Sequence, residues 1–123
     1  AKATALVVPS LKDKFDGISV RVPVPAGSIV DVTFVASRPT SVEEVNAALK
    51  TAAASEKWKR VFAVSEEPLV SSDILGLPYG SIADLTMTRV VDGTLVKVMA
   101  WYDNEMGYVH TLVEHVAEVG KRI

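Results

Sequence analysis

Alternating apolar and polar residues predict two strands in the first third of the chain. In residues 18–24 the β-branched residues all fall on one face of a strand. Residues 29–36 are rich in β-branched and aromatic residues, which favour a second strand. The turn sequence of residues 25–28 separates the two segments, so they are predicted to form an antiparallel pair. Pro23 places the first strand at a sheet edge or a bulge, because proline cannot donate to a neighbouring strand.

A stronger hairpin signal lies in the second half of the chain. Residues 82–91 and 94–102 are both strand-like, and Asp92-Gly93 separates them. This dipeptide favours a type I′ turn, because glycine accepts the positive φ that the turn requires. Residues 61–64 form a further short strand candidate. Residues 66–80 are predicted to be irregular, since they contain several prolines and glycines.

Three segments have helical patterns. Ser41 and Glu44 form a capping box, and the apolar stripe that follows predicts a helix that ends near residue 55. Residues 108–119 have apolar residues at helical spacing and predict an amphipathic helix. The first helical segment, residues 1–8, starts without a capping residue. That start suggests that the sequence was cut from something larger, and the alternative is a processed or frayed terminus.

These elements predict an α+β fold with a largely antiparallel sheet and helices on one face, in a single, partial domain over residues 1–123. Hydrophobic residues make up 49% of the chain and charged residues 23%, as is typical of a globular protein. A formal net charge of −2 gives no electrostatic reason to expect nucleic acid or an anionic membrane as partner. No apolar run approaches the roughly 20 residues that a membrane-spanning helix needs. A cytoplasmic location is the expectation.

Several common catalytic and metal-binding patterns are missing from the sequence. It has no cysteine, so it forms neither disulfides nor thiolate metal sites. It has no glycine-rich dinucleotide or phosphate-binding motif. His110 and His115 are five positions apart, which points them to different sides of a helix. No metal site is therefore expected.

Two residues have side chains suited to a ligand. Arg21 carries planar paired donors with a permanent charge, which suit a phosphate group. It could equally be an edge-strand charge that prevents sheets from pairing. Asn104 lies just before the C-terminal helix, where Asp103 or Asn104 is a natural N-cap. Its carboxamide could instead hydrogen-bond another amide, so both interpretations stay open for each residue.

Five blocks of the sequence occur in the order that is typical of one enzyme family. They are Arg21-Val22-Pro23-Val24-Pro25, SVEEVNAAL at residues 41–49, EPLVSSD at 67–73, Asp92-Gly93 followed by LVKV at 95–98, and WYDNEMGY at 101–108. Together they resemble the C-terminal part of the catalytic domain of phosphorylating glyceraldehyde-3-phosphate dehydrogenases. The resemblance covers nearly the whole chain and implies that the family's N-terminal dinucleotide-binding domain is absent from it.

The resemblance implies a role for three residues. Arg21 would bind the substrate phosphate, Asn104 would hydrogen-bond the nicotinamide carboxamide of NAD, and Tyr108 would pack beside the nicotinamide ring. NADP is an alternative cofactor. Met106 stands where the family most often has tryptophan, which weakens the inferred contact with NAD. The family's catalytic cysteine and histidine lie upstream of the first helical segment, so no catalytic residue is assigned here and the chain alone is expected to be inactive.

In the complete enzyme, the resemblance implies oxidation and phosphorylation of an aldehyde in glycolysis. The expected partners are a sugar-phosphate aldehyde, inorganic phosphate, the upstream dehydrogenase segment and further copies in a homo-oligomer, which is a tetramer in the family. Two alternatives stay open. One is a non-catalytic assembly or interaction module, suggested by the missing nucleophile. The other is an enzyme for a related aldehyde such as erythrose 4-phosphate, whose phosphate Arg21 would bind equally well.

Overall fold

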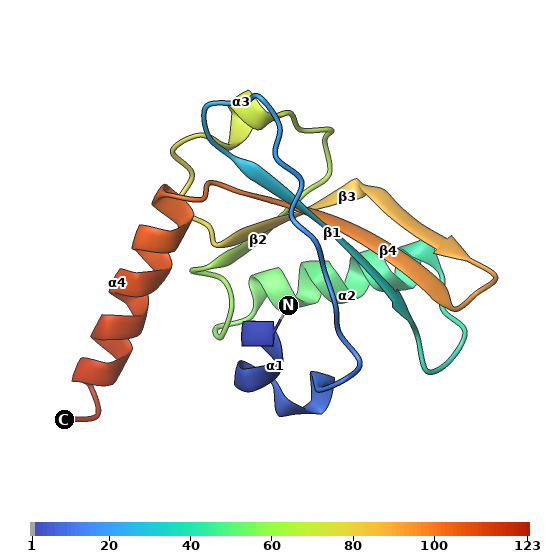
Figure 1. Ribbon diagram of the computed structural model, residues 1–123, viewed down its shortest axis with the longest axis horizontal. Helices are drawn as coiled ribbons and strands as arrows, with labels where there is room; N and C mark the ends of the chain where they lie inside the picture. The colour runs from blue at the N-terminus through green and yellow to red at the C-terminus, as the bar shows by residue number, and fades with distance from the viewer. Residues whose placement is uncertain (1) are drawn as a thin grey trace.

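A four-stranded mixed sheet forms the centre of the protein, as the computed structural model of residues 2–123 shows (Figure 1). The strands are β1 (Ser28–Val35), β2 (Phe62–Ser65), β3 (Ser81–Val91) and β4 (Leu95–Tyr102), in the spatial order β1-β4-β3-β2. β4 pairs antiparallel with both β1 and β3, whereas β2 pairs parallel with β3. The predicted α+β fold with a largely antiparallel sheet is therefore confirmed.

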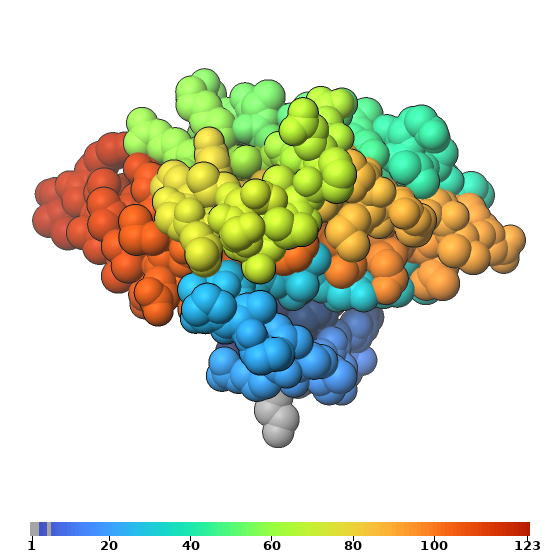
Figure 2. Space-filling view, turned by 90° about the horizontal axis from the view of Figure 1, so that it is seen from above, coloured from blue at the N-terminus to red at the C-terminus, as the bar shows by residue number. Residues whose placement is uncertain are grey.

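The helices differ in how closely they pack against this sheet. They are α1 (Lys2–Val7), the 3-10 helix η1 (Pro9–Leu11), α2 (Val42–Ala54), α3 (Ser71–Ile74) and α4 (Met106–Gly120). α2 packs on one face of the sheet against β2 and β3, and the N-terminal segment lies on the opposite side (Figure 2). α4 extends away from the sheet (Figure 1). None of the helices in residues 2–123 is long and apolar enough to cross a membrane.

The predicted strand over residues 18–24, and its pairing with the next strand, are wrong. The structure describes the whole segment and gives it no strand, and the side chains of Ile18 and Val20 are 92% and 74% exposed. β1 pairs with β4 instead, with Ser28 opposite Tyr102. The alternating pattern alone is misleading here, because the two prolines that follow Val22 remove the N–H donors that a ladder needs.

The predicted hairpin between β3 and β4 is confirmed. Asp92 and Gly93 have φ angles of 49° and 65°, the positive values that a type I′ turn requires. The Thr94 N–H closes the turn on the Val91 carbonyl at 3.3 Å. The Gly93 carbonyl also accepts the Thr40 N–H at 2.8 Å, so the turn anchors the loop that leads into α2.

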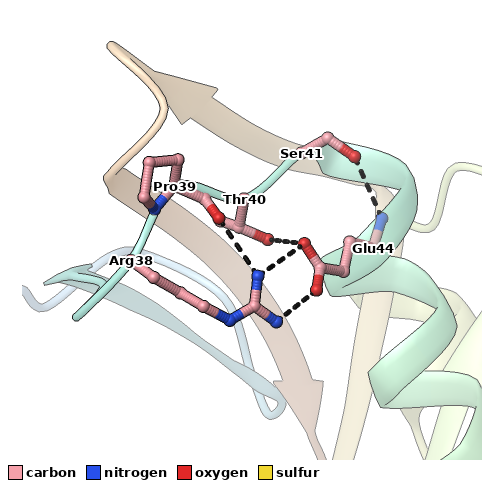
Figure 3. Close-up of polar contacts among 5 residues, drawn as sticks. All are labelled: Arg38, Pro39, Thr40, Ser41 and Glu44. Atoms are coloured by element: carbon pink, nitrogen blue, oxygen red, sulfur yellow. Dashed lines mark hydrogen bonds and ion pairs between the residues drawn. The ribbon is translucent and has the colours of Figure 1, made fainter.

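The predicted cap of α2 is present, but the capping box is only half formed (Figure 3). The Ser41 hydroxyl accepts the Glu44 N–H at 3.2 Å. The Glu44 carboxylate does not return to the cap. It accepts from the Thr40 hydroxyl at 2.9 Å and forms a two-pronged ion pair with Arg38. The Arg38 guanidinium, followed by the Thr40 hydroxyl, lowers the pKa of the Glu44 carboxyl. This cluster holds the β1–α2 loop in place.

A buried carboxylate fixes the end of β4 that leads toward α4. Asp84 on β3 is 1% exposed, and its carboxylate accepts from the Thr86 hydroxyl at 2.6 Å. Its other oxygen accepts from the indole Nε1–H of Trp101 at 3.3 Å. The register of β3 against β4 shifts just beyond Asp84, where Asp84 lies opposite Met99 and Arg89 opposite Lys97. The bulge therefore follows directly on the polar contact that orients Trp101.

Candidate functional site

The carboxamide of Asn104 is held in a defined orientation between β4 and α4. Its Oδ1 accepts a hydrogen bond from the backbone N–H of Gly27 at 3.0 Å. A backbone N–H can bond only to the oxygen of the amide, so this contact decides which atom is Oδ1 and which is Nδ2. Within residues 2–123, Nδ2 makes no hydrogen bond, and the residue is exposed. Asn104 therefore offers a free N–H donor to a ligand.

Asp103, and not Asn104, caps α4. The Oδ1 of Asp103 accepts the backbone N–H groups of Glu105 at 2.8 Å and Met106 at 2.9 Å. The first helical backbone bond also starts from Asp103, whose carbonyl accepts the Gly107 N–H at 3.0 Å. Because Asp103 takes the capping role, the alternative interpretation of Asn104 as a helix cap no longer applies.

The second carboxylate oxygen of Asp103 reaches a different part of the chain. Oδ2 accepts the N–H of Gly76, just beyond α3, at 2.9 Å. The side chain is 5% exposed. The N–H groups of Gly76, Met106 and Glu105, in that order of effect, lower the pKa of the Asp103 carboxyl. Asp103 is thus a charged acceptor for three backbone donors.

The first turn of α4 lies directly on the backbone that precedes β3. A Cβ atom on Gly107 would come within 2.5 Å of the Tyr79 carbonyl oxygen. A Cβ atom on Gly80 would come within 2.8 Å of a Thr111 methyl group. The two glycines permit this close approach, and α4 begins at Met106, slightly before the predicted start at residue 108. The beginning of the helix is therefore fixed from two sides.

Tyr108 lies one helical turn beyond Asn104. Asn104 lies in the turn before α4, and Tyr108 lies in the first turn of the helix. The Tyr108 side chain is 64% exposed, and that of Met106 is 47% exposed. Both residues are therefore accessible near the start of α4. An exposed aromatic ring can pack against the face of a planar heterocycle.

Arg21 lies in the irregular segment that leads to Gly27. The residue is exposed, and within residues 2–123 its guanidinium makes no hydrogen bond or ion pair. The interpretation as an edge-strand charge no longer applies, because the segment is not a strand. The structure ties the end of this segment to Asn104 through Gly27, but it shows no hydrogen bond between Arg21 and Asn104 or Tyr108.

The two histidines have no shared site. His110 Nε2 lies 3.1 Å from the Arg60 carbonyl oxygen, and the Arg60 guanidinium pairs with Glu114 at 3.0 Å. These contacts tie α4 to the loop that follows α2. Among the residues that the structure describes, no group of three or more His, Asp or Glu side chains could hold a metal ion.

The glycines at positions 27 and 76 belong to this site, although sequence reasoning did not identify them. Both have positive φ angles, 87° and 80°, a conformation that glycine adopts readily. Gly27 donates its N–H to Asn104, and Gly76 donates to Asp103. The sequence shows only that these glycines lie in loops. It does not show that their N–H groups bond to the side chains of Asn104 and Asp103.

A separate hollow lies away from these residues. It is an apolar groove of about 550 Å³ beside α2. Its walls are lined mainly by Val30, Val32, Phe34, Val45, Leu49 and Val98. Arg38, Thr40 and Glu44 lie at its polar border. Arg21, Asn104 and Tyr108 do not line it, so the groove is not part of the candidate site.

Residues 1–104 match the sequence profile of the family described as glyceraldehyde 3-phosphate dehydrogenase, C-terminal domain. The chain belongs to this family. It is 50% identical over 123 residues to glyceraldehyde-3-phosphate dehydrogenase 2 of Streptomyces avermitilis, and 46% identical over 123 residues to the Zymomonas mobilis enzyme. It is 49% identical over 122 residues to the enzyme of Geobacillus stearothermophilus. These matches cover 99% or 100% of the chain but 36% of each relative.

The chain thus spans about a third of the length of the curated glyceraldehyde-3-phosphate dehydrogenases that it matches, and it corresponds to their C-terminal part. The resemblance inferred from the ordered sequence blocks is confirmed. The match to the family profile ends at Asn104, two residues before α4 begins, whereas the match to the relatives continues through α4. The roles of Arg21, Asn104 and Tyr108 stay predictions.

Proposed function

We propose that the chain is the C-terminal segment of a phosphorylating, NAD-dependent glyceraldehyde-3-phosphate dehydrogenase. Asn104 and Tyr108 contact the nicotinamide, and Arg21 binds the phosphate of the aldehyde substrate. The observation that carries this proposal is the free amide donor of Asn104, which Gly27 holds in one orientation. Family membership supports it, since the matching relatives are glyceraldehyde-3-phosphate dehydrogenases.

Asn104 orients the nicotinamide by donating from Nδ2 to the carbonyl oxygen of the ring's carboxamide. Its Oδ1 is already engaged by Gly27, so the donor direction is set by the protein. Tyr108 restricts the ring from the side of α4. The nicotinamide supplies a hydride acceptor when bound, and the two side chains decide which face of the ring meets the substrate. A fixed orientation lowers the activation barrier, because the reacting groups are already aligned.

Arg21 binds the phosphate through charge and paired N–H donors. The residue has no internal partner among residues 2–123, so its donors are available to a ligand. Pro23 and Pro25 follow it and restrict the backbone of the segment. A guanidinium on a restricted backbone suits a dianion better than a mobile lysine would. The same contact would hold any aldehyde with a terminal phosphate, so erythrose 4-phosphate is a second candidate substrate.

The chemical step needs groups from the rest of the enzyme. The chain has no cysteine, and the ring of His110, on α4, lies against the carbonyl oxygen of Arg60 in the loop after α2. We therefore assign the nucleophile and the base that cleaves the acyl intermediate with inorganic phosphate to the upstream polypeptide. The chain alone is inactive in this proposal. In the family's homo-oligomeric enzyme it supplies binding groups.

Exposed apolar surface supports association with further polypeptide. Phe34 and Val32 on β1 are 45% and 40% exposed at the groove, and Val113 and Val116 on α4 are 59% and 62% exposed. Exposed apolar residues on both elements are typical of regions that contact further polypeptide. The contact region fits the assembly of this segment with the upstream part of the dehydrogenase.

The proposal is tested in a grafted enzyme, in which residues 1–123 replace the matching segment of the Geobacillus stearothermophilus relative. Asn104→Ala in the grafted enzyme should lower the rate of hydride transfer, measured as NADH formation in a single turnover. Ser41→Ala, which removes the side-chain cap of α2 at a distance from the site, is the control and should leave the rate unchanged. An unchanged rate for Asn104→Ala would overturn the assignment.

A further inference from the structure

Three separate parts of the chain meet where Asn104 is held. The turn that contains Gly27 rests on α3, because the Cβ position of Gly27 lies 3.6 Å from the Ser71 carbonyl oxygen and 3.9 Å from a Leu75 methyl group. Figure 1 shows α3 beside the segment that leads into β1. The loop after α3 returns to Asp103 through the N–H of Gly76. The side chain of Asn104, the next residue, accepts the N–H of Gly27 and so connects this loop back to the turn.

We propose that Asp103 is a positioning residue for Asn104. One carboxylate oxygen holds the start of α4 and the other holds Gly76, two residues beyond the end of α3, so the carboxylate links the segment after α3 to α4. α3 in turn supports the turn whose Gly27 N–H orients the Asn104 amide. The inference rests on the proposed function, in which that amide orients the nicotinamide.

The identity of the residue supports this role. Helix capping needs a single acceptor oxygen, which serine or asparagine would supply equally well. Three donors that arrive from two directions need two acceptor oxygens on one side chain, and in a short side chain only a carboxylate provides them. The bond to Gly76 adds nothing to the cap of α4. It is explained by a need to join α3 to α4.

The backbone on both sides of the carboxylate is shaped for these contacts. Gly76 has a φ of 80° and Gly27 a φ of 87°. Each of the two N–H donors therefore belongs to a glycine in the left-handed region of backbone conformation. Both conformations are strained for residues with a Cβ atom. The two glycines donate to adjacent residues, Asp103 and Asn104. This pairing indicates that the two contacts act as one unit.

The test uses the grafted enzyme and separates positioning from capping. Asp103→Ser retains an acceptor for the start of α4 but is too short to reach Gly76 as well. We expect a rate of hydride transfer lower by about tenfold to a hundredfold, the size of effect that a small misplacement of a reacting group produces. The KM for the aldehyde phosphate should stay unchanged, because Arg21 is not part of this unit. Ser41→Ala, a matched loss of a helix cap, should change neither quantity.

Hydrogen exchange at the turn gives a second readout that does not depend on NAD. In Asp103→Ser, the backbone amide of Gly27 should exchange about five- to tenfold faster, since the loss of one hydrogen bond has that effect. Mass spectrometry of the peptide that contains Gly27 measures it. If the serine variant does not fold, Asp103→Asn, which retains the size of the side chain and one acceptor oxygen, should show the same two changes.

The outcomes distinguish this inference from the proposed function. If Asp103→Ser leaves both the Gly27 exchange and the hydride-transfer rate unchanged while Asn104→Ala lowers that rate, the positioning role is wrong and the function stands. If Asp103→Ser speeds the exchange but neither variant changes the rate, Asp103 does position Asn104 and the assigned nicotinamide contact is wrong.

Discussion

The side chain of Asn104 accepts a hydrogen bond from the backbone N–H of Gly27, 77 positions away in the sequence, at 3.0 Å. This contact joins the end of β4 to the turn that precedes β1, although the two strands already pair along their length. The bond uses the oxygen of the amide and leaves the nitrogen available. A structural contact and a ligand-binding group are therefore combined in one side chain.

Replacing Asn104 by aspartate separates these two roles. In Asn104→Asp the carboxylate still accepts the Gly27 N–H, but the N–H donor that we assign to the nicotinamide is lost. We expect hydride transfer in the grafted enzyme to be slower by about fivefold to a hundredfold, because a buried acceptor left without its donor costs about 1–3 kcal/mol. The melting temperature should stay close to that of the unmodified graft. A variant with normal hydride transfer would show that the donor is not used.

Arg21→Ala should weaken binding of the phosphorylated substrate without affecting the fold. The expected rise in KM is about tenfold to a hundredfold, from the loss of a charged hydrogen bond of about 1.5–3 kcal/mol. Stability should not change, because Arg21 is exposed and has no internal partner among residues 2–123. Steady-state kinetics with glyceraldehyde 3-phosphate and with unphosphorylated glyceraldehyde give the comparison. An equal loss with both aldehydes would contradict a phosphate contact.

Gly107→Ala should destabilise the protein by about 1–3 kcal/mol, the usual cost of forcing an extra carbon into a packed position. The added Cβ would lie 2.5 Å from the Tyr79 carbonyl oxygen, which belongs to the backbone and cannot rotate away. Gly120→Ala, at the end of the same helix, is the matched control, since its Cβ would meet nothing within 4 Å. Thermal melting of both variants in the grafted enzyme tests the difference. Equal melting temperatures would show that the contact between α4 and the loop before β3 is not close.

Acid should weaken the junction at Asp103. The pKa of its carboxyl is lowered in the folded state below the ordinary value of 3.8, by the N–H groups of Gly76, Met106 and Glu105. Its contribution to the free energy of unfolding is therefore complete above pH 3.8 and is lost as the pH falls through the folded-state value. Urea unfolding of the chain over this range should show a shallower pH dependence for Asp103→Ser than for the unmodified chain. Identical slopes would mean that the carboxylate is not preferentially stabilised by folding.

Features that depend on neighbouring residues could be predicted from the sequence. The turn at Asp92 and Gly93 needs only a residue pair that tolerates positive φ, and the α2 cap needs only a hydroxyl at Ser41. The amphipathic α4 follows in the same way from the spacing of its apolar residues. Local rules were sufficient for these elements because their hydrogen bonds close within a few residues.

Features that depend on distant partners could not be predicted. Residues 18–24 alternate like a strand, but within residues 2–123 they pair with no other strand. Pro23 and Pro25 also lack the backbone N–H donors that strand pairing needs. The parallel pairing of β2 with β3 likewise has no local signal. For the candidate site, the residue types at Arg21 and Asn104 indicated chemistry. The contacts from Gly27 and Gly76 arise only when distant segments meet.

The single orientation of the Asn104 amide has a thermodynamic consequence. Terminal amides usually rotate between two nearly equivalent arrangements, and a ligand that needs one of them must select it. Here the Gly27 N–H makes that selection during folding. Association then requires little further loss of side-chain freedom, so this residue is preorganised for its ligand before the ligand arrives.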